Sequence, residues 1–108
     1  YIRIYMKLSF FFLTIFVTLF FTQLKGDEIF NIGKEIFLNS GNCAACHSLK
    51  DAGSNTMVGP NLNDIRPDIG RVKNAVINGV GVMPAYQGVL SDKEINAVSY
   101  YVSESVNN

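Results

Sequence analysis

The residues best suited to metal and redox chemistry lie together in one segment, CAACH, at positions 43–47. The chain has 108 residues, with two cysteines and one histidine. All three of these side chains fall within the five positions. Sulfur and imidazole nitrogen are the protein ligands that soft and borderline metals prefer. The segment therefore indicates a metal or cofactor site.

Four interpretations of this segment are open. A disulfide between Cys43 and Cys46 suits an oxidising compartment, but it gives His47 no role. Redox Cys-x-x-Cys pairs also usually accompany a βαβ pattern, which this sequence does not show. A zinc site needs four ligands, or three and a water, and the three side chains exhaust the sulfur and nitrogen donors. The third interpretation is three unrelated residues, and the fourth is covalent attachment of haem.

The spacing favours haem attachment for a direct reason. Two thiols three positions apart, about one helical turn, can reach the two vinyl groups on one edge of a porphyrin. The next residue, His47, then places its imidazole beneath the iron. Covalent attachment also supports a small domain whose own core is limited. We expect one haem c per chain, bonded through Cys43 and Cys46, with His47 as an iron ligand.

The second axial ligand is predicted from the positions of the methionines. Met83 lies in the loop NGVGVMPAY between two expected helices, where the chain can cross the far side of the haem. Met57 follows His47 by only ten residues and would have to turn back sharply. We therefore predict Met83 as the second ligand. The ring nitrogen of His47 that does not bind iron needs an acceptor, and the candidate is the backbone carbonyl of Pro60 in VGPNL.

The predicted ligand pair restricts the chemistry. Iron bound by both His47 and Met83 has no open position, and oxygen or peroxide chemistry requires one. A thioether ligand in an apolar pocket favours Fe(II) and hence a positive reduction potential. The sequence therefore predicts a one-electron carrier and not an enzyme.

The N-terminal segment 1–26 has the composition of an export signal. Arg3 and Lys7 precede an uncharged run of 17 residues from position 8 to position 24. A basic start, an apolar run and a small residue before the cut are typical of a secretory signal. We expect cleavage after Gly26. An uncleaved membrane anchor is the alternative, because 17 residues is the lower end of the range that spans a bilayer.

The remaining residues, 27–108, are expected to form one domain. They include six Lys or Arg and nine Asp or Glu, a net charge of −3. A nucleic-acid-binding surface would need concentrated Lys and Arg to neutralise phosphates. No such cluster is present in the sequence, so we expect no nucleic-acid partner.

Three helices are expected in the domain, and no segment alternates as a strand does. The helix near 27–40 carries an apolar stripe at helical spacing, and the helix near 67–79 should stop at Asn78-Gly79. The last helix begins at a capping box formed by Ser91 and Glu94. The apolar positions of the three helices are Ile29, Ile32, Gly33, Ile36 and Phe37, then Ile69, Val72 and Val76, and finally Ile95, Val98, Val102 and Val106. The fold is expected to be all-α, with three to four short helices and long loops around one covalently bound haem.

These features resemble the class I c-type cytochromes, most closely the cytochrome c6 (cytochrome c-553) family of cyanobacteria and algal plastids. The resemblance covers essentially all of the domain. It rests on NCAACH at 42–47, NGVGVMPAY at 78–86, LSDKEI at 90–95 and VSYYV at 98–102. It implies a small class I cytochrome c fold with His47 as a haem ligand, in the thylakoid lumen of a plastid or in a bacterial periplasm.

The resemblance also implies what the protein exchanges electrons with. A cytochrome bc-type or b6f-type complex would be the donor, and photosystem I or an oxidase the acceptor, with photosynthetic electron transport as the family's usual role. The first helix would cross the last one, with Gly33 and Phe37 meeting Tyr101. We expect a monomer.

Two positions differ from the family pattern for photosystem I donors. Ala75 stands where those proteins have a Gln that is linked to a raised haem potential. Val89 stands where they tend to have an Arg that assists docking. The alternatives are therefore a membrane-tethered c-type haem subunit, or a respiratory cytochrome c that delivers electrons to a terminal oxidase. A catalytic cytochrome with a displaceable Met83 is a third hypothesis.

Overall fold

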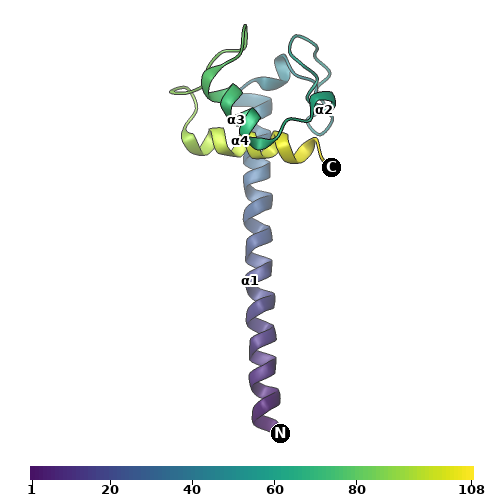
Figure 1. Cartoon of the computed structure of the whole chain (residues 1–108), viewed down its shortest axis with the longest axis vertical. Helices are drawn as coiled ribbons and strands as arrows, with labels where there is room; N and C mark the ends of the chain where they lie inside the picture. Colours follow the sequence, from purple (N-terminus) through teal and green to yellow (C-terminus); the bar gives the residue numbers. More distant parts are fainter.

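The computed structural model describes the backbone of residues 1–108 and the side chains of 1–21 and 25–108. Within this description the chain is helical and has no strand, only isolated bridges (Figure 1). The all-α prediction is confirmed. The elements are α1 (Ile2–Glu35), a π-helical turn (Ile36–Ser40), a 3₁₀ turn (Cys43–Ala45), α2 (Leu62–Ile65), α3 (Ile69–Asn78) and α4 (Asp92–Ser105).

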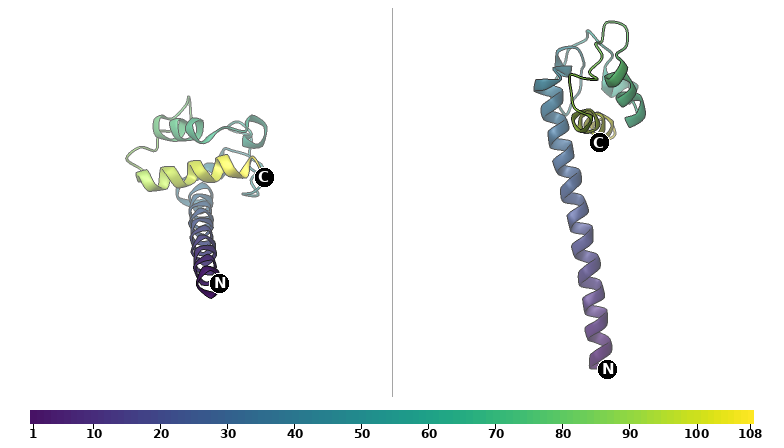
Figure 2. Two further views of the ribbon diagram at one scale, coloured as in Figure 1. Left: turned by 60° about the horizontal axis from the view of Figure 1, so that its bottom comes forward. Right: turned by 90° about the vertical axis from the view of Figure 1, so that its left-hand side faces the viewer.

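Helix α1 joins the predicted export segment to the first helix of the domain. It runs from Ile2 to Glu35 without a break at Gly26, and its N-terminal part projects away from the other helices (Figures 1 and 2). The stretch Ile2–Ser40 is long and apolar enough to cross a membrane. Its most apolar window is not buried in the protein. The predicted apolar run ends at positions 22–24, which lie outside the described side chains.

Helices α1 and α4 cross where α1 has no side chain. A Cβ atom added to Gly33 would lie 2.5 Å from Tyr101 Cβ and would also collide with the carbonyl oxygen of Ala97. Beside this contact the Phe37 and Tyr101 rings meet edge to face, with centroids 5.7 Å apart, and Phe30 approaches Tyr101 to 4.9 Å. Such edge-on pairs add to the energy of burial. The predicted crossing of Gly33 and Phe37 over Tyr101 is confirmed.

Only part of the first two predicted apolar stripes is buried, whereas the stripe of the last helix is buried throughout. Ile29 and Ile32 are 43% and 45% exposed, because α4 covers the neighbouring face of α1, around Gly33. Ile69, at the first position of α3, is likewise exposed. The buried apolar core comes from the π turn, the loops, α2, α3 and α4, and consists of Ile36, Phe37, Leu49, Leu62, Val72, Val76, Leu90, Ile95, Ala97, Val98, Tyr101, Val102 and Val106.

The helix ends follow local capping rules. Ser91 Oγ accepts a hydrogen bond from the Glu94 N–H at 3.2 Å, and the Glu94 carboxylate accepts one from the Ser91 N–H at 3.1 Å. This reciprocal pair is the predicted capping box. Asp68 caps α3 by accepting a hydrogen bond from the Arg71 N–H at 2.8 Å. Gly79 ends α3 with φ +72°, a conformation that glycine adopts without strain, so the predicted stop is confirmed.

The loop that follows CAACH is fastened to the α1–α4 crossing through Asp51. The Tyr101 hydroxyl donates a hydrogen bond to the Asp51 carboxylate at 2.7 Å. Lys34 Nζ lies 3.1 Å from the same carboxylate and donates to the Asp51 carbonyl oxygen at 2.8 Å. The hydrogen bond from Tyr101, followed by the interactions with Lys34, holds the pKa of Asp51 below its ordinary value.

We expect Asp51→Asn to lower the free energy of unfolding at neutral pH and to have less effect in acid. A carboxyl whose pKa is lowered by folding stabilises the fold above its unfolded pKa of about 3.9, and the contribution is lost as pH falls through the folded value. Urea denaturation at pH 7 and at acidic pH measures the difference. Asp64→Asn, at an exposed carboxylate outside this network, is the control. A wild-type–variant difference that is independent of pH would contradict the prediction.

Candidate functional site

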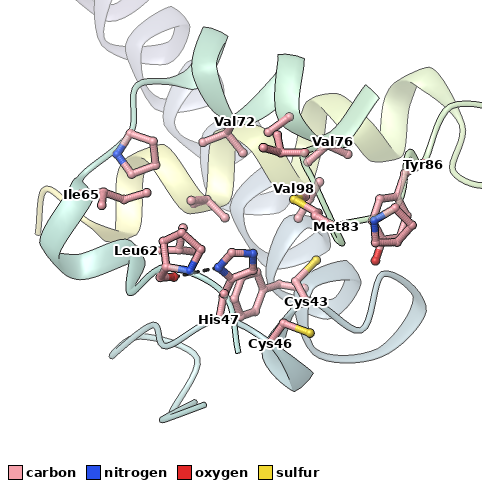
Figure 3. Close-up of a pocket in the computed structure, with 18 of the residues that line it drawn as sticks. Cys43, Cys46, His47, Leu62, Ile65, Val72, Val76, Met83, Tyr86 and Val98 are labelled. Carbon is pink, nitrogen blue, oxygen red and sulfur yellow. Dashed lines mark hydrogen bonds between the residues drawn. The ribbon is translucent and has the colours of Figure 1, made fainter. Parts of the chain in front are cut away.

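A cavity of about 330 Å³ lies between the CAACH segment, α2, α3, α4 and the loop after α3 (Figure 3). Its walls are mostly apolar, and a cavity of this kind with a few polar groups is the usual form of a cofactor site. The lining residues are Phe37, Asn42, Cys43, Cys46, His47, Val58, Gly59, Pro60, Leu62, Ile65, Pro67, Arg71, Val72, Ala75, Val76, Val80, Val82, Met83, Pro84, Tyr86, Val98 and Val102.

The CAACH segment forms one wall of this cavity. Asn42 adopts a left-handed conformation with φ 50°, which Asn tolerates better than most residues, and it turns the chain from the π turn into the 3₁₀ turn. The His47 N–H then donates to the Cys43 carbonyl oxygen at 2.9 Å. Cys43, Cys46 and His47 are thereby brought to the same wall (Figure 3).

The two thiols are free, and Cys43 is partly buried. Burial raises the pKa of the Cys43 thiol to about 11. Thiols of redox-active Cys-x-x-Cys pairs have lowered pKa values instead, so the disulfide interpretation gains no support. Among the side chains that the structure describes, no group of three or more His, Cys, Asp or Glu is arranged to hold a metal ion. The zinc-site interpretation therefore gains no support.

The imidazole of His47 is oriented by the VGPNL segment. Its Nδ1 lies 2.8 Å from the Pro60 carbonyl oxygen. Because a carbonyl can only accept, Nδ1 carries the hydrogen and donates it, which leaves Nε2 free to bind a metal. The Gly59 N–H donates to the Cys46 carbonyl at 2.7 Å, so the segment lies against the CAACH turn. A Cβ atom at Gly59 would come within 2.6 Å of His47 Cε1.

We expect Gly59→Ala to raise the reduction potential of the haem-loaded protein. The added methyl group would push the imidazole or the Pro60 carbonyl aside and weaken their hydrogen bond. A less basic imidazole stabilises Fe(III) less. A tenfold change in relative affinity corresponds to roughly 59 mV for one electron, so the rise should be tens of millivolts in a redox titration. Gly70→Ala, at an exposed position of α3, is the control. A reduction potential of Gly59→Ala equal to that of the wild type would contradict the prediction.

Met83 lies on the cavity wall, and Met57 does not. The loop after α3 places Met83 through a pair of backbone hydrogen bonds with Val80, at 3.1 and 2.9 Å. Gly79 permits this turn, because a Cβ atom there would lie 2.6 Å from the Met83 carbonyl oxygen. Met57 is 88% exposed and does not line the cavity. The same cavity therefore contains Met83 together with both cysteines and His47 (Figure 3).

Arg71, Ala75 and Tyr86 are among the lining residues that were not assigned to the site from the sequence. Arg71 and Ala75 lie one position before the buried Val72 and Val76, so they form a second row on α3 beside the core row. The spacing of four positions between Arg71 and Ala75 indicates that they share one face of the helix, and it could have placed them at the site. Tyr86 lines the cavity from the Met83 loop, within the quoted MPAY segment. Ala75, which differs from the family pattern, is thus in the wall of the site itself.

Comparison with known proteins gives consistent results. Residues 29–102 match the family model described as cytochrome c oxidase, cbb3-type, subunit III. Cytochrome c6 of Bryopsis maxima is 37% identical over 86 residues, which cover 70% of this chain and 91% of that protein. The cbb3-type cytochrome c oxidase subunit FixP of Bradyrhizobium diazoefficiens is 33% identical over 104 residues. These cover 73% of this chain but only 35% of FixP.

A solved structure extends the likeness to three dimensions. The c-type cytochrome SorU of Sinorhizobium meliloti superposes with a TM-score of 0.71 at 46% sequence identity, over 76% of this chain and 95% of SorU. The cofactor of such proteins is covalently bound haem c, and the donors present fit it. They are two free thiols, an imidazole with Nε2 available and a thioether, all on one apolar cavity. The chain belongs to the class I c-type cytochromes, in which haem c carries electrons.

Proposed function

We propose that Cys43 and Cys46 form the thioether bonds to the haem, that His47 and Met83 bind its iron, and that the Pro60 carbonyl orients His47. The observation that carries the proposal is that all these groups meet at one cavity. Bound haem supplies the exchange of one electron. With His47 and Met83 both bound to iron there would be no open position for a small substrate, so we propose a carrier and not an enzyme.

Carbon monoxide tests this proposal against a catalytic cytochrome. We expect the spectrum of the reduced, haem-loaded protein to stay unchanged under carbon monoxide at neutral pH, because Met83 occupies the only position the gas could take. Binding of carbon monoxide to the wild-type protein under these conditions would instead support a displaceable Met83 and an activity on a small molecule.

We propose that residues 27–108 form the mature domain, exported by segment 1–26 to a bacterial periplasm or a thylakoid lumen and acting there as a monomer. Signal segments and membrane anchors share the apolar composition found in α1. N-terminal sequencing of the native protein tests the cut after Gly26. Recovery of an intact α1 only in detergent extracts would support the alternative, a membrane-tethered haem subunit.

For the partners, we propose a cytochrome bc-type or b6f-type donor and an oxidase as the acceptor, with photosystem I as the second candidate. The likeness to cbb3-type oxidase subunits supports the first acceptor, and the likeness to cytochrome c6 supports the second. Ala75 in the cavity wall favours the oxidase, because the Gln of photosystem I donors is linked to a higher potential. The exposed Val89 offers no positive charge for docking.

The midpoint potential of the haem-loaded protein, compared with its Ala75→Gln variant, tests the choice of acceptor. A wild-type potential clearly below that of the photosynthetic chain, raised by the substitution, supports delivery to an oxidase. A wild-type potential that already matches the photosynthetic chain supports photosystem I and shows that Ala75 is tolerated there.

A further inference from the structure

One side-chain hydrogen bond joins the Met83 loop to the CAACH side of the cavity. The Tyr86 hydroxyl donates to the Gly41 carbonyl oxygen at 2.7 Å, between residues 45 positions apart. We propose that Tyr86 is a positioning residue for Met83, holding its loop against the haem-attachment segment so that the thioether stays on the iron. This inference rests on the proposed ligation by Met83.

Tyr86 is the point at which the loop between α3 and α4 is anchored. Its N–H donates to the Val76 carbonyl of α3 at 2.8 Å, and its own carbonyl accepts from the N–H groups of Val89 and Leu90, both at 2.9 Å. The hydroxyl adds the bond to Gly41. One residue thus links the loop to α3, to the approach of α4 and to the attachment segment.

The part of the loop that carries Met83 has weaker support. The backbone bonds described for Met83 run only to Val80, within the loop. Val80 and Val82 line the cavity and are 64% and 94% exposed, so their side chains pack little against other protein residues. Segments with few buried contacts open most readily. The loop therefore depends on its anchor at Tyr86, three positions after Met83.

The acceptor lies next to the proposed covalent attachment. Gly41 is buried and follows the π turn, and a Cβ atom there would approach Cys43 Sγ to 3.2 Å. Loss of the hydroxyl would leave the buried Gly41 carbonyl without this donor, which is costlier than the loss of an exposed hydrogen bond. Burial, with a smaller contribution from the nearby cysteines, raises the pKa of Tyr86, so the phenol keeps its proton at neutral pH.

Tyr86→Phe tests the proposal, because it removes the hydroxyl and retains the ring. In the ferric, haem-loaded protein, imidazole as an added ligand can bind only where Met83 has left the iron. We expect the apparent affinity for imidazole to rise about fivefold, the factor that corresponds to one lost hydrogen bond of about 1 kcal/mol. The long-wavelength charge-transfer band of ferric iron bound to methionine sulfur should also be lost at a lower temperature.

Tyr100→Phe is the matched control, since it makes the same chemical change on α4 at a residue that does not line the cavity. Its imidazole affinity should equal that of the wild type. An unchanged affinity in Tyr86→Phe would overturn the positioning role, even if the variant were less stable to urea. Absence of the methionine band from the wild-type protein would overturn the ligation by Met83 itself, so the two failures are distinguishable.

Discussion

Met83→Ala is expected to open the iron of the haem-loaded protein and to lower its reduction potential. The thioether favours Fe(II), so its loss should lower the potential by on the order of 100 mV, within the roughly 0.8 V range that axial ligands cover. The open position should then bind carbon monoxide in the reduced state, which we do not expect for the wild type. A redox titration and a carbon monoxide difference spectrum measure the two effects.

Met57→Ala is the matched control for this result. Met57 is the other methionine of residues 27–108, and it is 88% exposed and absent from the cavity wall. Its replacement should leave the potential and the carbon monoxide spectrum as they are. If Met57→Ala gave the large effects and Met83→Ala gave none, the proposed ligand assignment would be wrong.

The parts of the fold that could be predicted from the residues themselves are those set by near neighbours, whereas the crossing of Gly33 and Phe37 with Tyr101 was expected only from the family resemblance. The capping box depends on Ser91 and Glu94, three positions apart, and the end of α3 depends on Gly79. Helical periodicity located α3 and α4 because each buries one face against the other. The CAACH segment could be interpreted in the same way, since a single turn of chain places its thiols and imidazole on one wall.

The parts that could not be predicted depend on pairs far apart in the sequence. The bond from Tyr86 to Gly41 and the bond from Tyr101 to Asp51 span 45 and 50 positions. Neither tyrosine indicates its partner in the sequence, since the Gly41 acceptor is a backbone carbonyl and the Asp51 carboxylate is one of several acidic side chains in the domain. Ile29 and Ile32 have core-like periodicity but remain half exposed, because the close approach at Gly33 decides which face of α1 is covered.

The residues that adjust the properties of the haem ligands also come from segments far apart in the sequence. The two thiols and the imidazole that we propose to hold haem lie within five positions, whereas Met83 and the groups around the site come from distant segments. Gly59 and Pro60 shape the His47 side, and Tyr86 and Ala75 contribute to the rest of the wall. Groups that hydrogen-bond or pack against a metal ligand orient that ligand and adjust its basicity. Differences among related carriers are therefore expected at these wall positions more than in CAACH.

Gly33→Ala is expected to have the largest effect on stability, although alanine is the better helix former. In an exposed helix the change would stabilise by up to about 1 kcal/mol. At position 33 the new methyl group would meet the backbone of Ala97 and the Cβ of Tyr101, and neither can rotate away. The helices must separate, which also loosens the Tyr101 contacts with Phe37 and Phe30. Overpacking of this kind typically costs about 1–3 kcal/mol, and the fixed partners at position 33 place this variant at the upper end.

Urea denaturation of the haem-loaded domain, followed by circular dichroism, measures this loss, with Gly70→Ala as the control. A Cβ atom at Gly70 meets only Asp68 Oδ1 at 3.3 Å, and this oxygen, which caps α3, must shift by a few tenths of an ångström, so that variant should stay close to wild-type stability. The two substitutions are chemically identical, and helix propensity predicts the same sign for both. A large loss in Gly33→Ala alone would show that the α1–α4 crossing depends on the missing side chain at Gly33. Equal stability of both variants would mean that the helices can move apart at little cost, and that the crossing owes its position to the aromatic pairs instead.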